Sequence, residues 1–125
     1  MVILDTNIII DHLRQPSEKS RLRELEEKIP IRDLAISIIT IQELYEGKST
    51  IDKMHEKNLL ETINPFKILL YTQEVSKMAG ELARDSDRKI EFADAAMAAT
   101  AILNKAKLFT LNKKDFQGIK GLKLI

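Results

Sequence analysis

Three carboxylates, Asp5, Glu43 and Asp94, each lie inside or beside an apolar stretch of this 125-residue chain. Moving an ionised carboxylate away from water without a partner costs several kcal/mol, so the three acids predict a shared cation. Either Lys and Arg side chains or a metal ion would supply that positive charge. Carboxylate oxygens are the ligands that hard divalent cations such as Mg²⁺ prefer.

The sequence around Asp5 and Asp94 indicates where these acids lie on their elements. Asp5 follows the apolar run 2–4 and precedes a periodic apolar segment over 8–13, which predicts a turn between a strand and a helix. Asp94 opens an alanine-rich helix that has almost no polar face. Such a helix is expected at the centre of the fold, with its aspartate pointing inward.

Glu43 lies at the edge of the apolar stripe of a helix predicted over 38–46. Each of the three acids also has a plainer interpretation. Asp5 or Thr6 would cap the first helix and Asp94 the alanine-rich one, while Glu43 alone would be a solvated helix residue. These interpretations do not explain why the acids recur beside the three most apolar segments, which favours a common site.

The composition excludes several classes of site. The chain has no cysteine, which excludes disulfides, thiolate zinc sites and cysteine nucleophiles, so a metal is expected to be held by oxygen. The net charge is only +1, but residues 105–125 contain six lysines and one acid, Asp115. This local positive charge suits a polyanionic substrate, and an ordinary solvated surface is the alternative.

No targeting or membrane segment is evident. No apolar stretch reaches the roughly 18 residues that a membrane span needs, and no basic region precedes the first apolar run. We therefore expect a cytoplasmic protein that does not enter a membrane.

The order of apolar runs and helical periods predicts one α/β domain over residues 1–125. Strand patterns fall near 2–4, 34–37, 66–70, 107–110 and 122–125, and helical periods near 8–13, 17–29, 38–46, 51–63, 75–82 and 93–103. This alternation favours a parallel sheet with helices on both faces and a ligand site at the carboxyl ends of its strands. Asp5, Ser37 and residues 110–115 would meet there.

Four motifs in order carry a family resemblance: residues 2–7, Ser37 followed by 43–44, residues 94–101 and residues 109–116. They resemble the PIN-domain nucleases, and most of all the VapC-type toxins of prokaryotic type II toxin–antitoxin systems. The resemblance spans nearly the whole chain. It implies a three-layer α/β/α sandwich around a mostly parallel sheet of about five strands, with an acidic pocket that binds Mg²⁺ or Mn²⁺ and cleaves RNA.

Roles follow from the resemblance residue by residue. The acidic, metal-binding triad would be Asp5, Glu43 and Asp94, and the side chains that order the surroundings of the metal or contact substrate would be Thr6, Asn7, Ser37, Thr110 and Asn112. The fourth acidic position has two candidates. Many relatives carry an acid where this chain has Asn112, and Asp115 lies three residues further on and is the favoured contributor.

The predicted reaction is in-line hydrolysis of a phosphodiester bond, leaving a 5′-phosphate and a 3′-hydroxyl as in similar enzymes. Asp5 and Asp94 would bind the principal ion, and Glu43 would complete its coordination or orient the attacking water. Asp115 or Asn112 would help a second ion that arrives with the substrate.

Two other function classes stay open, a Mg²⁺-dependent phosphotransfer or receiver domain and a non-catalytic module that binds RNA or protein. The resemblance also implies a homodimer that a small antitoxin holds inactive. The helices over 38–63 are expected to contribute to dimer or antitoxin contact, with plain core packing as the alternative, through Tyr45, Met54, Leu59 and Leu60.

Overall fold

A computed structural model of the protein describes residues 1–15 and 17–125. At its centre is a five-stranded sheet in the order β3-β2-β1-β4-β5, in which every neighbouring pair is parallel. The strands are β1 (Val2–Leu4), β2 (Leu34–Ser37), β3 (Lys67–Leu69), β4 (Lys107–Phe109) and β5 (Lys123–Leu124). The predicted parallel α/β sheet is confirmed.

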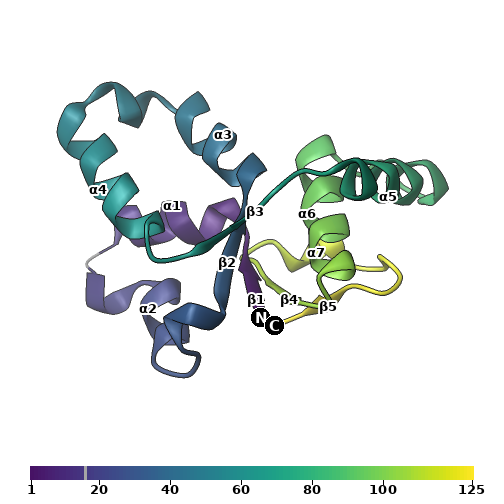
Figure 1. Cartoon of the computed structure of the whole chain (residues 1–125), viewed down its shortest axis with the longest axis horizontal. Coiled ribbons are helices and arrows are strands. Elements are labelled where there is room, and N and C mark those ends of the chain that lie inside the picture. Colours follow the sequence, from purple (N-terminus) through teal and green to yellow (C-terminus); the bar gives the residue numbers. More distant parts are fainter. Residues whose placement is uncertain (16) are drawn as a thin grey trace.

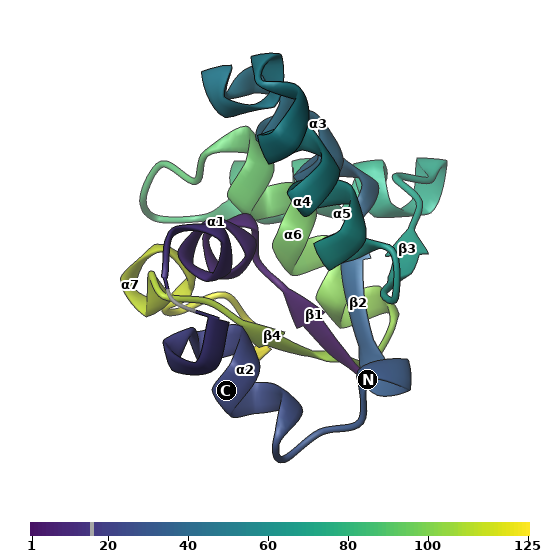
Figure 2. The same ribbon diagram turned by 90° about the vertical axis from the view of Figure 1, so that its left-hand side faces the viewer.

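Helices connect the strands and cover both faces of the sheet. They are α1 (Thr6–Arg14), α2 (Arg21–Glu26), α3 (Ile38–Glu46), α4 (Lys53–Ile63), α5 (Gln73–Asp85), α6 (Phe92–Leu103) and α7 (Lys113–Phe116), with short 3₁₀ turns at Ser17–Lys19, Ile31–Asp33 and Lys48–Ile51. Figure 1 shows α1, α2 and α4 on one side of the sheet and α5, α6 and α7 on the other. Figure 2 looks from the side of α1 and α2 and shows β1 between β2 and β4.

Alternate residues of each strand enter different cores, as the twofold period of a strand requires. Val2 and Leu4 of β1 pack into a core shared with α1 to α4, whereas Ile3 packs into a second core beneath α6. On α6 the second core takes Met97, Ala98 and Ala101, none more than 1% exposed. The small side chains of α6 therefore let this helix lie close to the sheet, as a central helix was predicted to do.

Capping side chains shift two helix starts from their predicted positions. Helix α4 begins at Lys53, two residues later than predicted, because the Asp52 carboxylate accepts from the backbone N–H groups of residues 54 and 55. Helix α2 begins at Arg21, where the Ser20 hydroxyl accepts from the N–H of Arg23. The four-residue helix α7 was not predicted, since it is too short to show a helical period.

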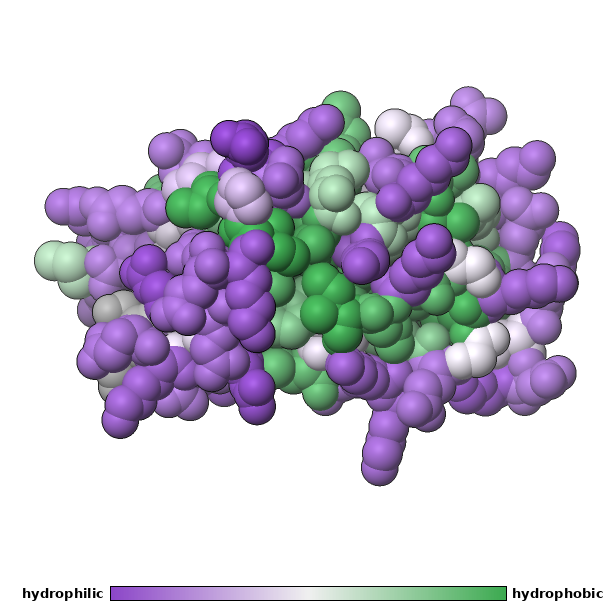
Figure 3. Space-filling model, turned by 90° about the horizontal axis from the view of Figure 1, so that it is seen from below, coloured by the Kyte–Doolittle hydropathy of each residue, from purple (hydrophilic) through white to green (hydrophobic). Residues whose placement is uncertain are grey.

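No helix within residues 1–15 and 17–125 has the length and apolar character that crossing a membrane requires. Figure 3 views the molecule from the side on which Figure 1 places both termini, and apolar side chains are exposed in the middle of that face. Met1, 43% exposed, is one of the exposed large apolar residues of the protein. Hydrophilic side chains cover the flanks of this face.

Candidate functional site

The candidate site lies at the carboxyl ends of the central strands. Asp5 follows β1, Ser37 ends β2 and Thr110 follows β4. Strand β1 has β2 on one side and β4 on the other, so the strand order reverses beside β1. Ligands of open parallel sheets bind at such a reversal.

Asp5 is both a helix cap and a buried acid. Its Oδ1 accepts from the backbone N–H of Thr6 at 2.8 Å, and its Oδ2 accepts from the Thr110 hydroxyl at 2.7 Å. A carboxylate can accept about four hydrogen bonds, so the donors around Asp5 leave room for a further partner. Burial raises the pKa of Asp5, and the charge of Asp115 adds to this, while the hydrogen bonds from Thr110 and Thr6 lower it.

Thr110 holds the loop after β4 against the turn after β1. Its hydroxyl donates to Asp5 and accepts from Asn7 Nδ2 at 3.3 Å and from the N–H of Asn112 at 3.0 Å. Asn7 Oδ1 in turn accepts from the N–H of Leu111 at 3.2 Å. One proton and two lone pairs are all that a hydroxyl offers, so Thr110 is fully used.

Glu43 reaches the same region from α3. Its Oε1 accepts a 2.6 Å hydrogen bond from the Thr6 hydroxyl, and the hydroxyls of Thr6 and Thr40 lie 3.1 Å apart in a further hydrogen bond. Burial raises the pKa of Glu43, the bond from Thr6 lowers it, and the charge of Asp5 raises it. The sequence reasoning missed Thr40, although a threonine in an isoleucine-rich run one turn before Glu43 could have indicated it.

Ser37 does not contact the acids. Its buried hydroxyl accepts from the N–H of Ile39 at 3.1 Å and caps α3. Ser37 therefore fixes where α3 begins, and through α3 the position of Glu43.

Asp94 lies in the first turn of α6 and is partly buried. The residue at the cap position is Glu91, which makes no side-chain capping bond, so Asp94 does not serve as the cap. Burial raises the pKa of Asp94 to about 6, and the charges of Asp5, Asp115, Glu43 and Glu91 contribute in that order. Acids from α3, from α6 and its cap position, from α7 and from the end of β1 thus repel one another in one region of the molecule.

Asp115 is exposed on α7, and Asn112 precedes that helix without a side-chain capping bond. A guanidinium nitrogen of Arg88 donates to the carbonyl oxygens of Asp115 at 2.8 Å and of Gln117 at 3.0 Å. Arg88 therefore anchors the backbone that carries Asp115. Nothing in the sequence pointed to this arginine, because the contact joins residues far apart in the chain.

The ion pairs of the described residues test the first of the two predicted sources of positive charge, the Lys and Arg side chains. No Lys, Arg or His in this part of the chain lies within 4.0 Å of the carboxylate of Asp5, Glu43, Asp94 or Asp115. Basic side chains therefore do not neutralise these acids.

The donor set suits a hard divalent cation, because it consists of carboxylate, hydroxyl and amide oxygens. Among residues 1–15 and 17–125, no three Asp, Glu or His side chains are arranged to hold one ion between them as they stand. The sharing of one ion by Asp5, Glu43 and Asp94 stays a prediction. Mg²⁺ commonly takes only one or two carboxylates and keeps several waters.

The whole chain is similar to known proteins in sequence and in fold. A PIN-domain family model matches residues 2–122. The Ribonuclease VapC1 of Methanocaldococcus jannaschii is 31% identical over 98% of this chain and 85% of its own length. Among solved structures, a DNA-bound VapBC from Salmonella typhimurium aligns with a TM-score of 0.83 and 26% identity over 99% of this chain and 96% of that one. A toxin–antitoxin complex from Klebsiella pneumoniae aligns with a TM-score of 0.79 and 29% identity over 100% and 96%.

Proposed function

The chain belongs to the PIN-domain family, and from that premise we propose that it is the ribonuclease toxin of a toxin–antitoxin pair, hydrolysing RNA phosphodiester bonds with a divalent cation. One observation carries the proposal. Four carboxylates from different elements influence one another at the carboxyl end of the sheet, with no basic side chain of the described residues paired to them.

Asp5 and Asp94 would hold Mg²⁺ or Mn²⁺, and Asp115 or Asn112 would help a second ion. A cation bound there supplies positive charge to the scissile phosphate and a more acidic water. The protein's own contribution is orientation. Thr110 fixes both the Asp5 carboxylate and the loop that leads to α7, and Thr6 fixes Glu43 where it can orient a water.

A groove beside Glu43 supports an antitoxin as partner. A cavity of about 280 Å³ lies between α1, α3 and α4, with walls that include Leu13, Leu44 and Leu59, and Glu43 also lines it. A peptide seated there would contact apolar side chains and lie next to the acids, where it would exclude RNA. Similar solved structures are themselves described as VapBC or toxin–antitoxin complexes.

The helix surface that was expected to contact a partner divides in two. Tyr45, Met54 and Leu60 are exposed at 41%, 62% and 46%, whereas Leu59 is 2% exposed and packs in the core. The three exposed side chains remain available for a dimer or an antitoxin contact. The resemblance further leads us to propose that the protein is a homodimer and that it is cytoplasmic. Sedimentation of the purified protein would test the oligomeric state.

The decisive experiment incubates the purified protein with total RNA and Mg²⁺ or Mn²⁺ and maps the new ends. We expect cleavage that leaves 5′-phosphates and stops in EDTA. Asp94→Asn should lower the rate about 100-fold or more, because a catalytic metal contributes several kcal/mol. Asp87→Asn, which changes an exposed acid, is the matched control.

A second readout does not depend on activity. Mg²⁺ should raise the melting temperature of the wild-type protein, because a ligand that binds only the folded state stabilises it. The shift should be lost in Asp94→Asn and kept in Asp87→Asn. Undiminished metal-dependent cleavage by folded Asp94→Asn would refute the proposal.

A further inference from the structure

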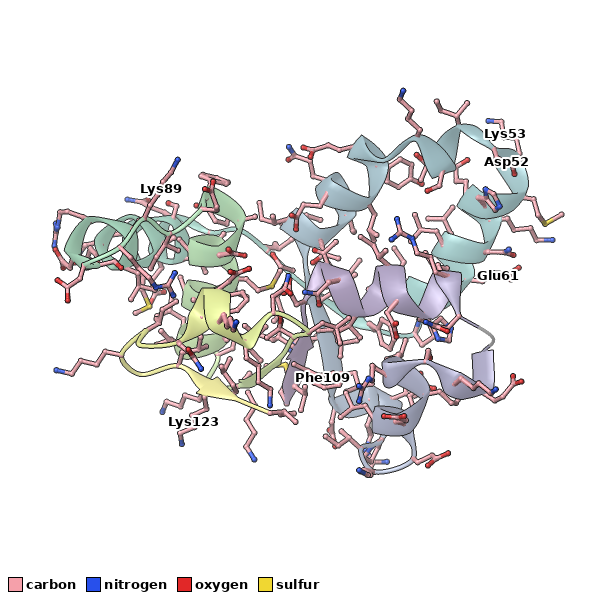
Figure 4. The ribbon with its side chains drawn as sticks, turned by 180° about the vertical axis from the view of Figure 1, so that it is seen from behind. Asp52, Lys53, Glu61, Lys89, Phe109 and Lys123 are labelled. Atoms are coloured by element: carbon pink, nitrogen blue, oxygen red, sulfur yellow. The ribbon has the colours of Figure 1, made fainter. Side chains whose placement is uncertain are left out.

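A second cavity lies next to the acids, between α2 and the segment that follows β4. Its volume is about 780 Å³, within the range of roughly 300–1,000 Å³ typical of small-molecule sites. Figure 4 places Phe109 between α2 and the C-terminal part of the chain, and this side chain lines the cavity.

The cavity is continuous with the acidic site through three shared residues. Thr110, Asn112 and Asp115 all line it. Thr110 is hydrogen-bonded to Asp5, and Asp115 acts electrostatically on Asp94. A chain molecule whose phosphate lay at the acids would therefore extend directly into this cavity.

The rim of the cavity is basic. Lys113 and Lys114 come from α7, and Arg21 and Lys28 come from α2 and the turn after it. Four basic side chains thus oppose two acids of the lining, Glu24 and Asp115. A guanidinium nitrogen of Arg21 lies 3.6 Å from a carboxylate oxygen of Glu24, and both side chains are exposed. The three lysines of the rim form no ion pair among the described residues.

The remaining walls are apolar. Leu25, Phe109, Leu111 and Ile125 line the cavity, and Leu111 is 45% exposed. An apolar wall beside a basic rim matches a nucleotide, whose base has apolar faces and whose phosphate is anionic. Single-stranded nucleic acids bind in the same way, with backbone phosphates on basic side chains and bases stacked on aromatic rings.

We propose that this cavity binds the single-stranded RNA segment next to the scissile phosphate, which rests on the proposed function. Arg21, Lys28, Lys113 and Lys114 contact its phosphates, and a base lies against Phe109 and Leu111. The acids alone would repel a polyanion, and the adjacent basic rim offsets this repulsion. Two of these basic residues, Arg21 and Lys28, come from α2 and the turn after it, more than 80 residues before α7 in the chain.

The test measures binding of a labelled single-stranded RNA in EDTA, so that metal-dependent cleavage does not interfere. The variant is Arg21→Gln combined with Lys28→Gln, both exposed and distant in sequence from the acids. We expect weaker binding and a slope of log K against log salt that is shallower by about 1.4, since each phosphate contact on a single strand contributes roughly 0.7.

The matched control is Lys67→Gln combined with Lys77→Gln, which removes the same charge from β3, at the opposite edge of the sheet, and from α5. This control should bind RNA with the wild-type slope. An unchanged slope in the Arg21 and Lys28 variant, or an equal loss in the control, would overturn the assignment of the cavity.

A polyphosphate of equal charge tests the apolar wall. RNA should bind more tightly than polyphosphate, and equal competition would overturn the contact with a base. Cleavage by the wild-type protein with Mg²⁺ is measured separately. If the slope becomes shallower in the Arg21 and Lys28 variant but the wild-type protein does not cleave RNA, the binding site stands and the proposed function is rejected. If the wild-type protein cleaves RNA and the slope of the variant is unchanged, the proposed function stands and the binding site is rejected.

Discussion

The hydroxyl of Thr110 donates a 2.7 Å hydrogen bond to Oδ2 of Asp5 and joins the carboxyl ends of two neighbouring parallel strands across 105 residues of chain. The bond crosses the place where the strand order of the sheet reverses. It fixes the orientation of the most buried acid of the site, so the geometry of the candidate site depends on a side chain that performs no chemistry itself.

Removing this hydroxyl should affect both stability and activity. We expect Thr110→Ala to lower the free energy of unfolding by about 1–3 kcal/mol, because buried hydrogen-bonding groups lose their partner. The same change should lower RNA cleavage by about 10–100-fold, the cost typical of losing a group that orients a metal ligand. Thr110→Ser keeps the hydroxyl and should retain most of the stability and most of the cleavage rate. Urea unfolding and single-turnover cleavage measure the two quantities. Equal losses in the two variants would contradict this role.

The Thr6 hydroxyl should matter through Glu43. Thr6→Val keeps the shape of the side chain but leaves the Glu43 carboxylate without its 2.6 Å donor. We expect about a tenfold loss of cleavage with an unchanged KM for RNA, because Glu43 would then be misoriented. Thr6→Ser is the control. A variant that changes only KM would show that Thr6 acts in binding the substrate.

The raised pKa of Asp94 predicts a pH-dependent stability. With a pKa of about 6 in the folded protein and 3.8 as the ordinary value, the folded state binds more protons than the unfolded state between roughly pH 4 and pH 6. The free energy of unfolding therefore falls as the pH rises through this window, and the loss is complete above it.

Asp94→Asn should remove that loss. In EDTA at about pH 7.5 we expect the variant to be more stable than the wild type by about 1 kcal/mol, a figure reduced because Asp94 is partly exposed to solvent. The difference should disappear near pH 4, and Asp87→Asn should show no such change between the two conditions. Urea unfolding at both pH values measures this, and a variant no more stable at neutral pH would disprove the linkage.

The groove between α1, α3 and α4 can be tested by measuring how tightly the protein binds its proposed antitoxin. Leu13 lines the groove and is 39% exposed, so Leu13→Glu should fold normally and weaken capture by the antitoxin about tenfold or more. Leu70→Glu makes the same change at a side chain that is 66% exposed and does not line the groove. Titration calorimetry of the two variants should separate them, and equal affinities would exclude the groove.

Much of the fold could be predicted from the sequence because its signals are local. The apolar runs before Asp5 and Ser37 gave strands, and the alanine-rich segment after Asp94 gave the central helix. The short helix α7 gave no periodic signal. The start of α4 depends on the carboxylate of Asp52, which accepts hydrogen bonds from the backbone N–H groups that a preceding helical turn would otherwise bind.

The site was predictable only in part. Acids beside apolar residues can be recognised in a sequence, and Asp5, Glu43 and Asp94 were singled out in this way. The contacts of Thr40 with Thr6 and of Arg88 with the carbonyl of Asp115 join distant segments, and no spacing along the chain encodes them. Arg21 and Lys28 likewise line one cavity together with the lysines of α7, and this proximity also arises from folding and not from spacing along the chain.

Asp5 caps α1 and also supplies a carboxylate to the site. Asparagine caps helices about as well as aspartate but carries no charge. If the proposed function holds, one nucleotide change at this codon would disarm the toxin without unfolding it. Such a product would bind the antitoxin in place of intact copies. In a cell whose antitoxin inhibits the active toxin, co-expression of the Asp5→Asn chain should therefore restore toxicity.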